Sequence, residues 1–165
     1  APSPYGIRYR FQTGSGWSKI RTVAKGQKEQ TPDVTVAPDG SVGIIWGTYD
    51  DFNAAFAEYH NGKKENYIND IDGGLAQSLW PRIATDCTGK FVFAFQGKSV
   101  PSASWNIYYR TYDPALNKLT KRKTVVALGT QEQTPAIAAT NITAIVWANT
   151  SYRTIYGSVT PIECP

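Results

Sequence analysis

The sequence predicts an all-β protein made of about three four-stranded repeats of the propeller type, each of roughly 50 residues. Three observations lead to this prediction: an internal repeat, short apolar runs between turn signals, and the lack of an apolar stripe at helical spacing with capping residues. A trefoil-like three-fold barrel is the alternative, because three units in about 150 residues also suit that fold.

The clearest internal repeat joins two segments that lie 103 residues apart. The ten residues VAKGQKEQTP (23–32) match VALGTQEQTP (126–135) at seven positions. An offset of 103 residues is too long for one repeat unit, so a middle copy is expected at about half that offset. At an offset of 49 residues, three positions recur: Pro32 as Pro81, Gly40 as Gly89, and Trp46 as Phe95. The chain therefore divides into a half-unit (5–30), two units (31–78 and 79–133) and a partial unit (134–160), within one β domain (1–165).

Each unit contains the same series of strand and turn signals. A short β run follows a Pro, which is tolerated at the start of a strand, and a turn with Gly comes next. The apolar runs that follow are near-continuous, as expected for strands buried on both faces: Val42–Trp46, Phe91–Phe95 and Ile142–Trp147. A Tyr-rich strand such as Ile107–Tyr112 and a polar strand complete the unit.

The motifs of the middle unit resemble the sialidase-like (BNR-type) propeller repeats of secreted bacterial and fungal proteins. They are Pro81-x-Ile83-Ala84-x-Asp86-x-x-Gly89, the aromatic strand ends Trp46, Phe95 and Trp147, and Asn106–Arg110. The segment Phe11–Ser18 resembles the Asp-box turn of that family but lacks its acidic residue. The resemblance implies a propeller fold, and the motifs that carry it are structural.

We expect no enzymatic activity, no catalytic residues and no cofactor. Sialidase chemistry needs an arginine cluster and a Tyr nucleophile activated by Glu, whereas the arginines here follow the repeat: Arg8, Arg10, Arg82, Arg110 and Arg153. His60 is the only histidine, and no Ser or Cys stands in a nucleophile context. We expect no metal site, because the acidic segments 50–51 and 70–73 lack calcium-loop spacing and indicate turns.

Ligand-binding candidates are the tryptophans outside the apolar strands and the polar residues that recur with the repeat. Trp46 and Trp147 end apolar strands and are expected in the core. Exposed aromatic rings that stack on sugars and polar groups that bind hydroxyls would make one site per repeat. The candidates are Trp17, Trp80, Trp105, Arg110, Glu29 and Glu132. For Glu29 and Glu132 the alternative is a structural role at the strand turn.

These features predict a secreted, non-catalytic, carbohydrate-binding (lectin-like) protein whose partners are glycans. The first alternative is a structural subunit of an extracellular ring or filament, and the second is a fragment of a propeller glycoside hydrolase. Unpaired edges of an incomplete repeat predict a homo-oligomer. The net charge is +4, but the basic residues are scattered, so no nucleic-acid partner is expected.

Secretion is predicted from cysteines, sequons and the N-terminus. Cys87 and Cys164 are the only cysteines and are expected to form a disulfide. Asn141 and Asn149 begin N-glycosylation sequons, and a chain beginning Ala-Pro-Ser-Pro suits a mature protein whose signal peptide has been removed. No apolar stretch approaches 18 residues, so no membrane span is expected. The sequence leaves open the sugar, the oligomeric state, whether the sequons are used, and whether the chain is part of a larger propeller.

Overall fold

The computed structural model describes residues 6–26, 28–48 and 52–164. For Thr13 it describes the backbone alone. Every regular element in this part of the chain is a β-strand, which confirms the all-β prediction. All strand pairs are antiparallel.

The strands form one N-terminal pair, one small hairpin and three larger sheets. The N-terminal pair is β1 (Ile7–Tyr9) and β4 (Arg21–Ala24), and the hairpin between them is β2 (Gln12–Thr13) and β3 (Gly16–Trp17). The first sheet is β5 (Glu29–Val36), β6 (Val42–Thr48), β7 (Asn53–His60) and β8 (Lys63–Ile68). The second sheet is β9 (Gln77–Thr85), β10 (Phe91–Lys98) and β11 (Asn106–Asp113), with β12 (Lys118–Leu119) and β13 (Lys123–Val126) both paired to β11. The third sheet is β14 (Glu132–Ala139), β15 (Ile142–Asn149) and β16 (Thr154–Pro161).

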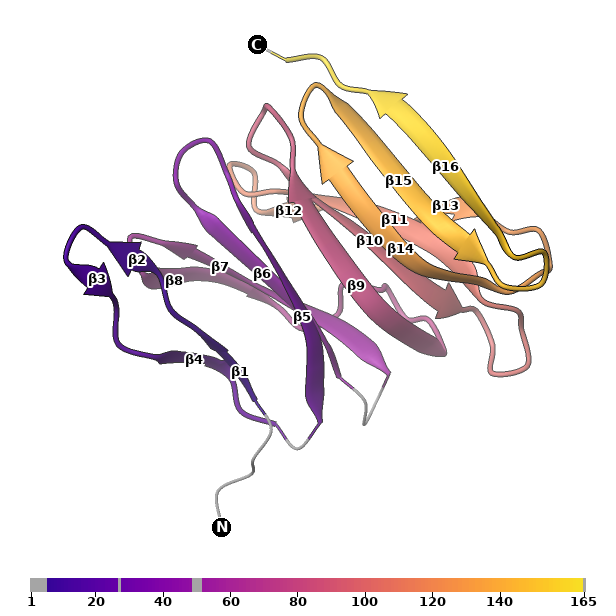
Figure 1. Cartoon of the computed structure of the whole chain (residues 1–165), viewed down its shortest axis with the longest axis horizontal. Coiled ribbons are helices and arrows are strands. Elements are labelled where there is room, and N and C mark those ends of the chain that lie inside the picture. Colours follow the sequence, from indigo (N-terminus) through magenta and orange to yellow (C-terminus); the bar gives the residue numbers. More distant parts are fainter. Residues whose placement is uncertain (1–5, 27, 49–51, 165) are drawn as a thin grey trace.

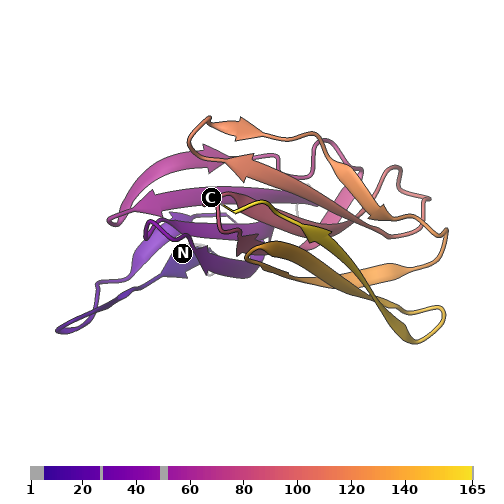
Figure 2. The same cartoon turned by 90° about the horizontal axis from the view of Figure 1, so that it is seen from above.

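The sheets lie side by side in chain order, from the N-terminal pair to the third sheet (Figure 1). The sheets of the described residues do not close into a barrel, so the three-fold barrel alternative is wrong. Figure 2 shows the β2–β3 hairpin projecting beyond the sheets. The unit boundaries at residues 31, 79 and 134 stay a prediction.

The apolar core lies between neighbouring sheets, which explains the near-continuous apolar runs. Between the first and second sheets, Phe56 meets the rings of Phe91 and Phe93, with centroids 5.3 and 5.0 Å away. Ile7 of the N-terminal pair packs with Trp46 of the first sheet. Trp147 of the third sheet lies in a cluster that includes Ala94 of the second sheet. Trp46 and Trp147 are therefore core residues, as the sequence predicts.

The repeated proline marks a bulge in the first strand of each larger sheet. The residues that precede Pro32, Pro81 and Pro135 have left-handed backbones, with φ of 47° at Thr31, 48° at Trp80 and 48° at Thr134. The strand register shifts at each of these places. Such a conformation is uncommon for residues other than Gly, and a bulge bends the strand and turns a backbone amide out of the ladder.

Cys87 and Cys164 form a disulfide with a Cα–Cα distance of 5.7 Å, as predicted. Cys87 lies in the turn after β9, and its backbone N–H donates to the carbonyl of Thr140 in the β14–β15 turn (3.0 Å). The disulfide thereby ties the segment after β16 to the second sheet. No helix in the described residues is long and apolar enough to cross a membrane.

Candidate functional site

A groove of about 670 Å³ lies between β1 and the first strands of the first sheet. Its volume is within the range of roughly 300–1,000 Å³ that is usual for small-molecule sites. Apolar lining comes from Pro32, Val34, Val36, Val42 and Ile44, and aromatic and polar lining comes from Arg8, Tyr9, Arg10, Phe11 and Asn61. Val34 and Val36 are 59% and 63% exposed, so apolar surface is open to solvent here.

The groove exists because β1 has a neighbour on only one side. In the second sheet, β11 pairs with β10 along one edge and with β13 along the other. β1 resembles β11 in sequence. β1 pairs with β4, just as β11 pairs with β13. In the described part of the chain, no strand takes the place beside β1 that β10 has beside β11.

At one end of the groove, two residues that line it, Arg10 and Phe11, each form a cation–π pair with a residue outside the lining, Trp17 and Arg21 respectively. The Arg10 guanidinium carbon lies 5.9 Å from the centre of the Trp17 ring, and Arg10 Nε donates to the carbonyl of Ser18 at 3.0 Å. The Arg21 guanidinium carbon lies 5.2 Å from the centre of the Phe11 ring. Trp17 is 63% exposed, so one face of its ring is available to a ligand. Arg8 is exposed, and its side chain has no hydrogen bond or ion pair among the described residues.

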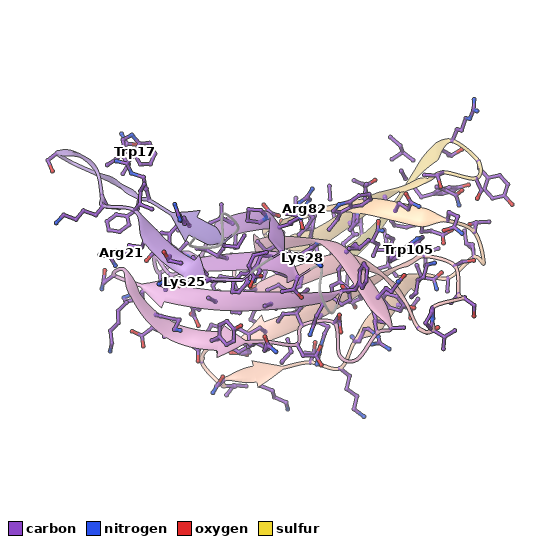
Figure 3. The ribbon with its side chains drawn as sticks, turned by 90° about the horizontal axis from the view of Figure 1, so that it is seen from below. Trp17, Arg21, Lys25, Lys28, Arg82 and Trp105 are labelled. Carbon is purple, nitrogen blue, oxygen red and sulfur yellow. A yellow bond between two sulfur atoms is a disulfide. The ribbon has the colours of Figure 1, made fainter. Side chains whose placement is uncertain are left out.

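The tryptophans proposed from the sequence do not converge on one site. Trp17 and Trp105 lie on opposite sides of the molecule, with Lys28 and Arg82 between them (Figure 3). Trp105 is half-buried, with Lys98 Nζ 4.8 Å from its ring centre. Trp80 is half-buried at the bulge of β9. Trp17, Trp80 and Trp105 therefore remain separate candidates, as expected for one site per repeat, and the ligand-binding role of each stays a prediction.

Glu132 is fully buried in a polar network at the start of the third sheet. Its Oε1 accepts hydrogen bonds from Asn149 Nδ2 (3.0 Å) and from the Thr130 hydroxyl, while no partner of Oε2 is found in the described part of the chain. Its backbone N–H donates to the carbonyl of Trp105 (3.1 Å). Because no part of Glu132 is exposed, the structure favours its structural role over the ligand-binding one.

Asn149 requires a correction to the glycosylation prediction. The residue is fully buried, and its Nδ2 donates to the Thr130 hydroxyl (2.7 Å) as well as to Glu132. A glycan replaces one of the two hydrogens on Nδ2, so at least one of these bonds would be lost, and the side chain is 0% exposed in this fold. Asn141 is exposed in the turn after β14 and has room for a glycan.

Arg110 holds a loop rather than a ligand. Its Nε donates to the carbonyl of Thr120 (2.7 Å), and Nη1 donates to the carbonyl of Ile71 (3.0 Å). Burial lowers the pKa of Arg110, and the neighbouring carboxylate of Asp70 acts in the opposite direction. The guanidinium group is thus engaged by backbone oxygens.

The acidic segment 70–73 is a turn, as the sequence indicates. Asp72 Oδ1 accepts from the backbone N–H of Gly74 (3.0 Å) and of Leu75 (3.3 Å), and Asp70 Oδ1 accepts from that of Gly73 (2.6 Å). Asp72 is only 2% exposed. Burial raises the pKa of Asp72 from its usual 3.8 to about 7, and the nearby Asp70 adds to the rise.

The side chain of Glu29 lies against the backbone at the end of the N-terminal pair. Its Oε1 is 2.0 Å from the position that a Cβ on Gly26 would occupy, so a side chain at Gly26 would force Glu29 to move. Glu29 is half-buried. This close fit accounts for Gly26 beside Glu29, whereas Gly129 in the second copy has no atom within 4 Å of its Cβ position and has a left-handed backbone with φ of 73°.

The sequence missed Tyr9, Arg10 and Phe11 as candidates. In sequence, Ile7–Arg10 looks like a copy of Ile107–Arg110, whose role in the second sheet is structural. Tyr9, Arg10 and Phe11 line the groove because the edge of β1 is open. A local sequence pattern cannot predict that a strand edge is open. Of the candidates predicted from the sequence, Trp17 lies nearest to these residues, since Arg10 packs over its ring.

Comparisons with known proteins support the fold only. No family model matches the chain, and no curated protein matches it. The solved structure of Hadza microbial sialidase Hz136 is similar, with a TM-score of 0.57 and 9% sequence identity. The similarity covers 81% of this chain and 35% of that chain, so this chain spans well under half of the sialidase. The shared feature is an all-β fold.

Proposed function

We propose that this chain is a secreted, non-catalytic carbohydrate-binding module built from propeller-type sheets. The observation that carries the proposal is the groove beside β1, which Arg10 lines, together with the exposed ring of Trp17, whose centre lies 5.9 Å from the Arg10 guanidinium carbon just outside the groove lining. Aromatic rings bind the apolar faces of sugars, and guanidinium groups donate several hydrogen bonds to hydroxyl or anionic oxygens.

The charge at the groove favours glycans that carry a carboxylate or sulfate group. Arg8 and Arg10 line the groove, and Arg21 lies over Phe11. The one acidic lining residue, Asp33, already accepts two backbone hydrogen bonds, from Ile83 (3.0 Å) and from Val34 (3.0 Å). Positive charge therefore dominates this end, and an Arg pairs with anions in a bidentate way.

The test is glycan-array binding of the purified chain, followed by titration calorimetry with the best neutral and the best acidic oligosaccharide. We expect acidic glycans to bind, and Trp17→Ala to weaken binding about tenfold, which corresponds to about 1.4 kcal/mol. Leu116→Ala is the matched control, because Leu116 is 70% exposed in the β11–β12 turn, outside the groove lining. Binding that is unchanged in Trp17→Ala, or no binding to any glycan, would reject the proposal.

A second candidate is that the chain is one segment of a larger propeller of the glycoside hydrolase type. The open edge of β1 and the coverage of only 35% of the sialidase structure favour it. The intact mass of the protein from its natural source separates the two candidates. A mass near 18.2 kDa, plus any glycan, supports the binding module, and a mass two- to threefold larger supports the segment.

A further inference from the structure

A second cavity, of about 350 Å³, lies between the second and third sheets. One wall comes from β10, β11 and β13, and the other comes from β15 and β16. Six of the side chains that line it carry a hydroxyl group: Tyr109, Thr111, Thr124, Thr143, Ser158 and Thr160. None of these hydroxyls has a hydrogen-bond partner among the described residues. The cavity therefore offers six unengaged hydroxyls to a ligand.

The same space between the first and second sheets is filled by three aromatic rings. Phe56 of β7 meets Phe91 of β10 and Tyr112 of β11, with ring centres 5.3 and 5.6 Å away. Phe56 and Phe91 are 0% exposed and Tyr112 is 1% exposed. Close packing of this kind is what the repeat achieves where its aromatic positions are all occupied.

Two of these three rings are replaced by threonines at the cavity. Phe91 and Thr143 both lie four residues before the aromatic residue that ends the apolar run of their strand. On the next strand, Phe91 pairs with Tyr112 and Thr143 pairs with Thr160. Thr143 and Thr160 thus have the repeat positions of Phe91 and Tyr112, and the smaller side chains leave the space open.

A carboxylate likewise replaces an apolar side chain. Ala37 and Asp86 begin equivalent turns, because their backbone N–H groups donate to the carbonyls four residues later, those of Ser41 (2.7 Å) and Lys90 (3.0 Å). Ala37 packs in the core between the first and second sheets, whereas Asp86 lines the cavity and is only 5% exposed. Asp86 Oδ1 accepts bonds from Thr88 and Lys90, while Oδ2 has no partner in the described part of the chain. This oxygen is left to accept from whatever occupies the cavity.

We propose that this cavity binds a single neutral sugar residue, at a site separate from the groove beside β1. A hydroxyl group both donates and accepts hydrogen bonds, so the lining matches the hydroxyls of a sugar ring. Lys123, whose Nζ lies 5.7 Å from the centre of the Tyr109 ring, adds a donor, and Asp86 adds an acceptor. Their opposite charges leave no excess charge for an ionic ligand. In the groove, by contrast, arginines favour acidic glycans, so the two sites differ in ligand.

The disulfide links the two walls of the cavity. Asp86 directly precedes Cys87, and Ile162, which lines the cavity from the other side, lies two residues before Cys164. The backbone N–H of Ile162 also donates to the carbonyl of Asn141 (2.8 Å). A cavity with cross-linked walls is formed before its ligand arrives, as is usual for small-molecule sites.

Amide NMR titration of the chain with the methyl glycosides of glucose, galactose, mannose and N-acetylglucosamine tests this site. We expect at least one glycoside to shift the amide signals of residues 143 and 160. The dissociation constant should be on the order of 1 mM, as is usual for so small a ligand.

Thr143→Val combined with Thr160→Val removes two hydroxyls and nearly keeps the shape of the cavity, so affinity should fall at least about tenfold. Thr154→Val is the matched control, because Thr154 lies on the same strand and the same face as Thr160 but outside the lining. It should bind as the wild type does. Circular dichroism melts check folding. Ser158→Ala, with an expected loss of about threefold, is the milder variant if the double variant unfolds.

The proposal fails if none of the four glycosides shifts residues 143 and 160. Binding that persists unchanged in the double variant and in Ser158→Ala would place the ligand elsewhere. Tighter binding of methyl glucuronide than of methyl glucoside at these residues would show that the cavity selects an anion. Trp17→Ala should leave all of these results unchanged, since Trp17 does not line the cavity, so the outcome is independent of the groove.

Discussion

The backbone N–H of Thr134 donates a hydrogen bond of 2.9 Å to Oε1 of Gln96 on the neighbouring sheet. Thr134 is the left-handed residue of the β14 bulge, and Gln96 is only 1% exposed. The bulge turns this amide out of its own ladder, and the buried side chain of β10 receives it. This bond fixes the start of the third sheet against the second.

Gln96→Leu should therefore destabilise the protein by about 1–2 kcal/mol, because the amide of Thr134 loses its acceptor while the volume of the side chain is kept. Urea unfolding followed by tryptophan fluorescence measures the change. Gln12→Leu, at an exposed position of β2, should stay within about 0.5 kcal/mol of the wild type. Equal stability of the two variants would show that the bond contributes nothing.

The disulfide should contribute up to about 4 kcal/mol of stability, because it closes a loop with a sequence separation of 77. We expect the double variant Cys87→Ser with Cys164→Ser to unfold at lower urea than the oxidised wild type. Reduction should lower the stability of the wild type and leave the double variant unchanged. Thiol titration of the unreduced, denatured wild type should find no free thiol, and two thiols per chain would contradict the pairing.

Stability should fall as the pH rises from about 4 to above 7, because of Asp72. Its pKa in the folded state is about 7, above the usual 3.8, so the folded chain holds a proton that the unfolded chain has released. The stability that this proton gives is complete below pH 4 and is lost as the pH passes 7. The loss is at most about 4 kcal/mol, since each pKa unit corresponds to about 1.4 kcal/mol.

Asp72→Asn tests that pH dependence, because an amide oxygen can accept the same backbone N–H bonds from Gly74 and Leu75. Thermal melts at pH 5 and pH 8 should differ less in this variant than in the wild type. Asp113→Asn is the control, since Asp113 is a carboxylate paired with Lys90 at 3.4 Å. A variant with the wild-type pH profile would show that Asp72 is ionised throughout.

Expression in a glycosylating host should place a glycan on Asn141 and leave Asn149 unmodified. Asn141 is exposed, whereas Nδ2 of Asn149 is engaged with Thr130 and Glu132. Glycopeptide mass spectrometry of the folded, secreted protein measures the occupancy of both sites. Asn141→Gln should remove all glycan, and a folded product with glycan on Asn149 would contradict the network.

The sheets and the disulfide could be predicted from sequence, whereas the groove could not. Apolar runs such as Val42–Trp46 report burial directly, because the central strands β6 and β10 are covered on both faces. The groove depends on the open edge of β1, which is a relation between strands distant in the chain. The burial of Asn149 likewise depends on Glu132, 17 residues away.

The tryptophan candidates show the same limit. Trp17 and Trp105 both stand near Gly- or Ser-rich segments, so their local patterns look alike. Their positions differ because Trp17 belongs to a projecting hairpin and Trp105 leads into β11. Local composition identifies a loop, but the sheet order decides which loops meet.

The disulfide between Cys87 and Cys164 makes a covalent circle of most of the second sheet and the whole third sheet. A protease that cuts once inside this circle, for example beside the exposed Val100 or Leu116, leaves both fragments attached to each other. The nicked protein would keep its mass on a non-reducing gel and separate only after reduction. A cut in the β2–β3 hairpin, which lies outside the circle, has no such tether, and only the packing of β1 would then hold the N-terminal fragment in place.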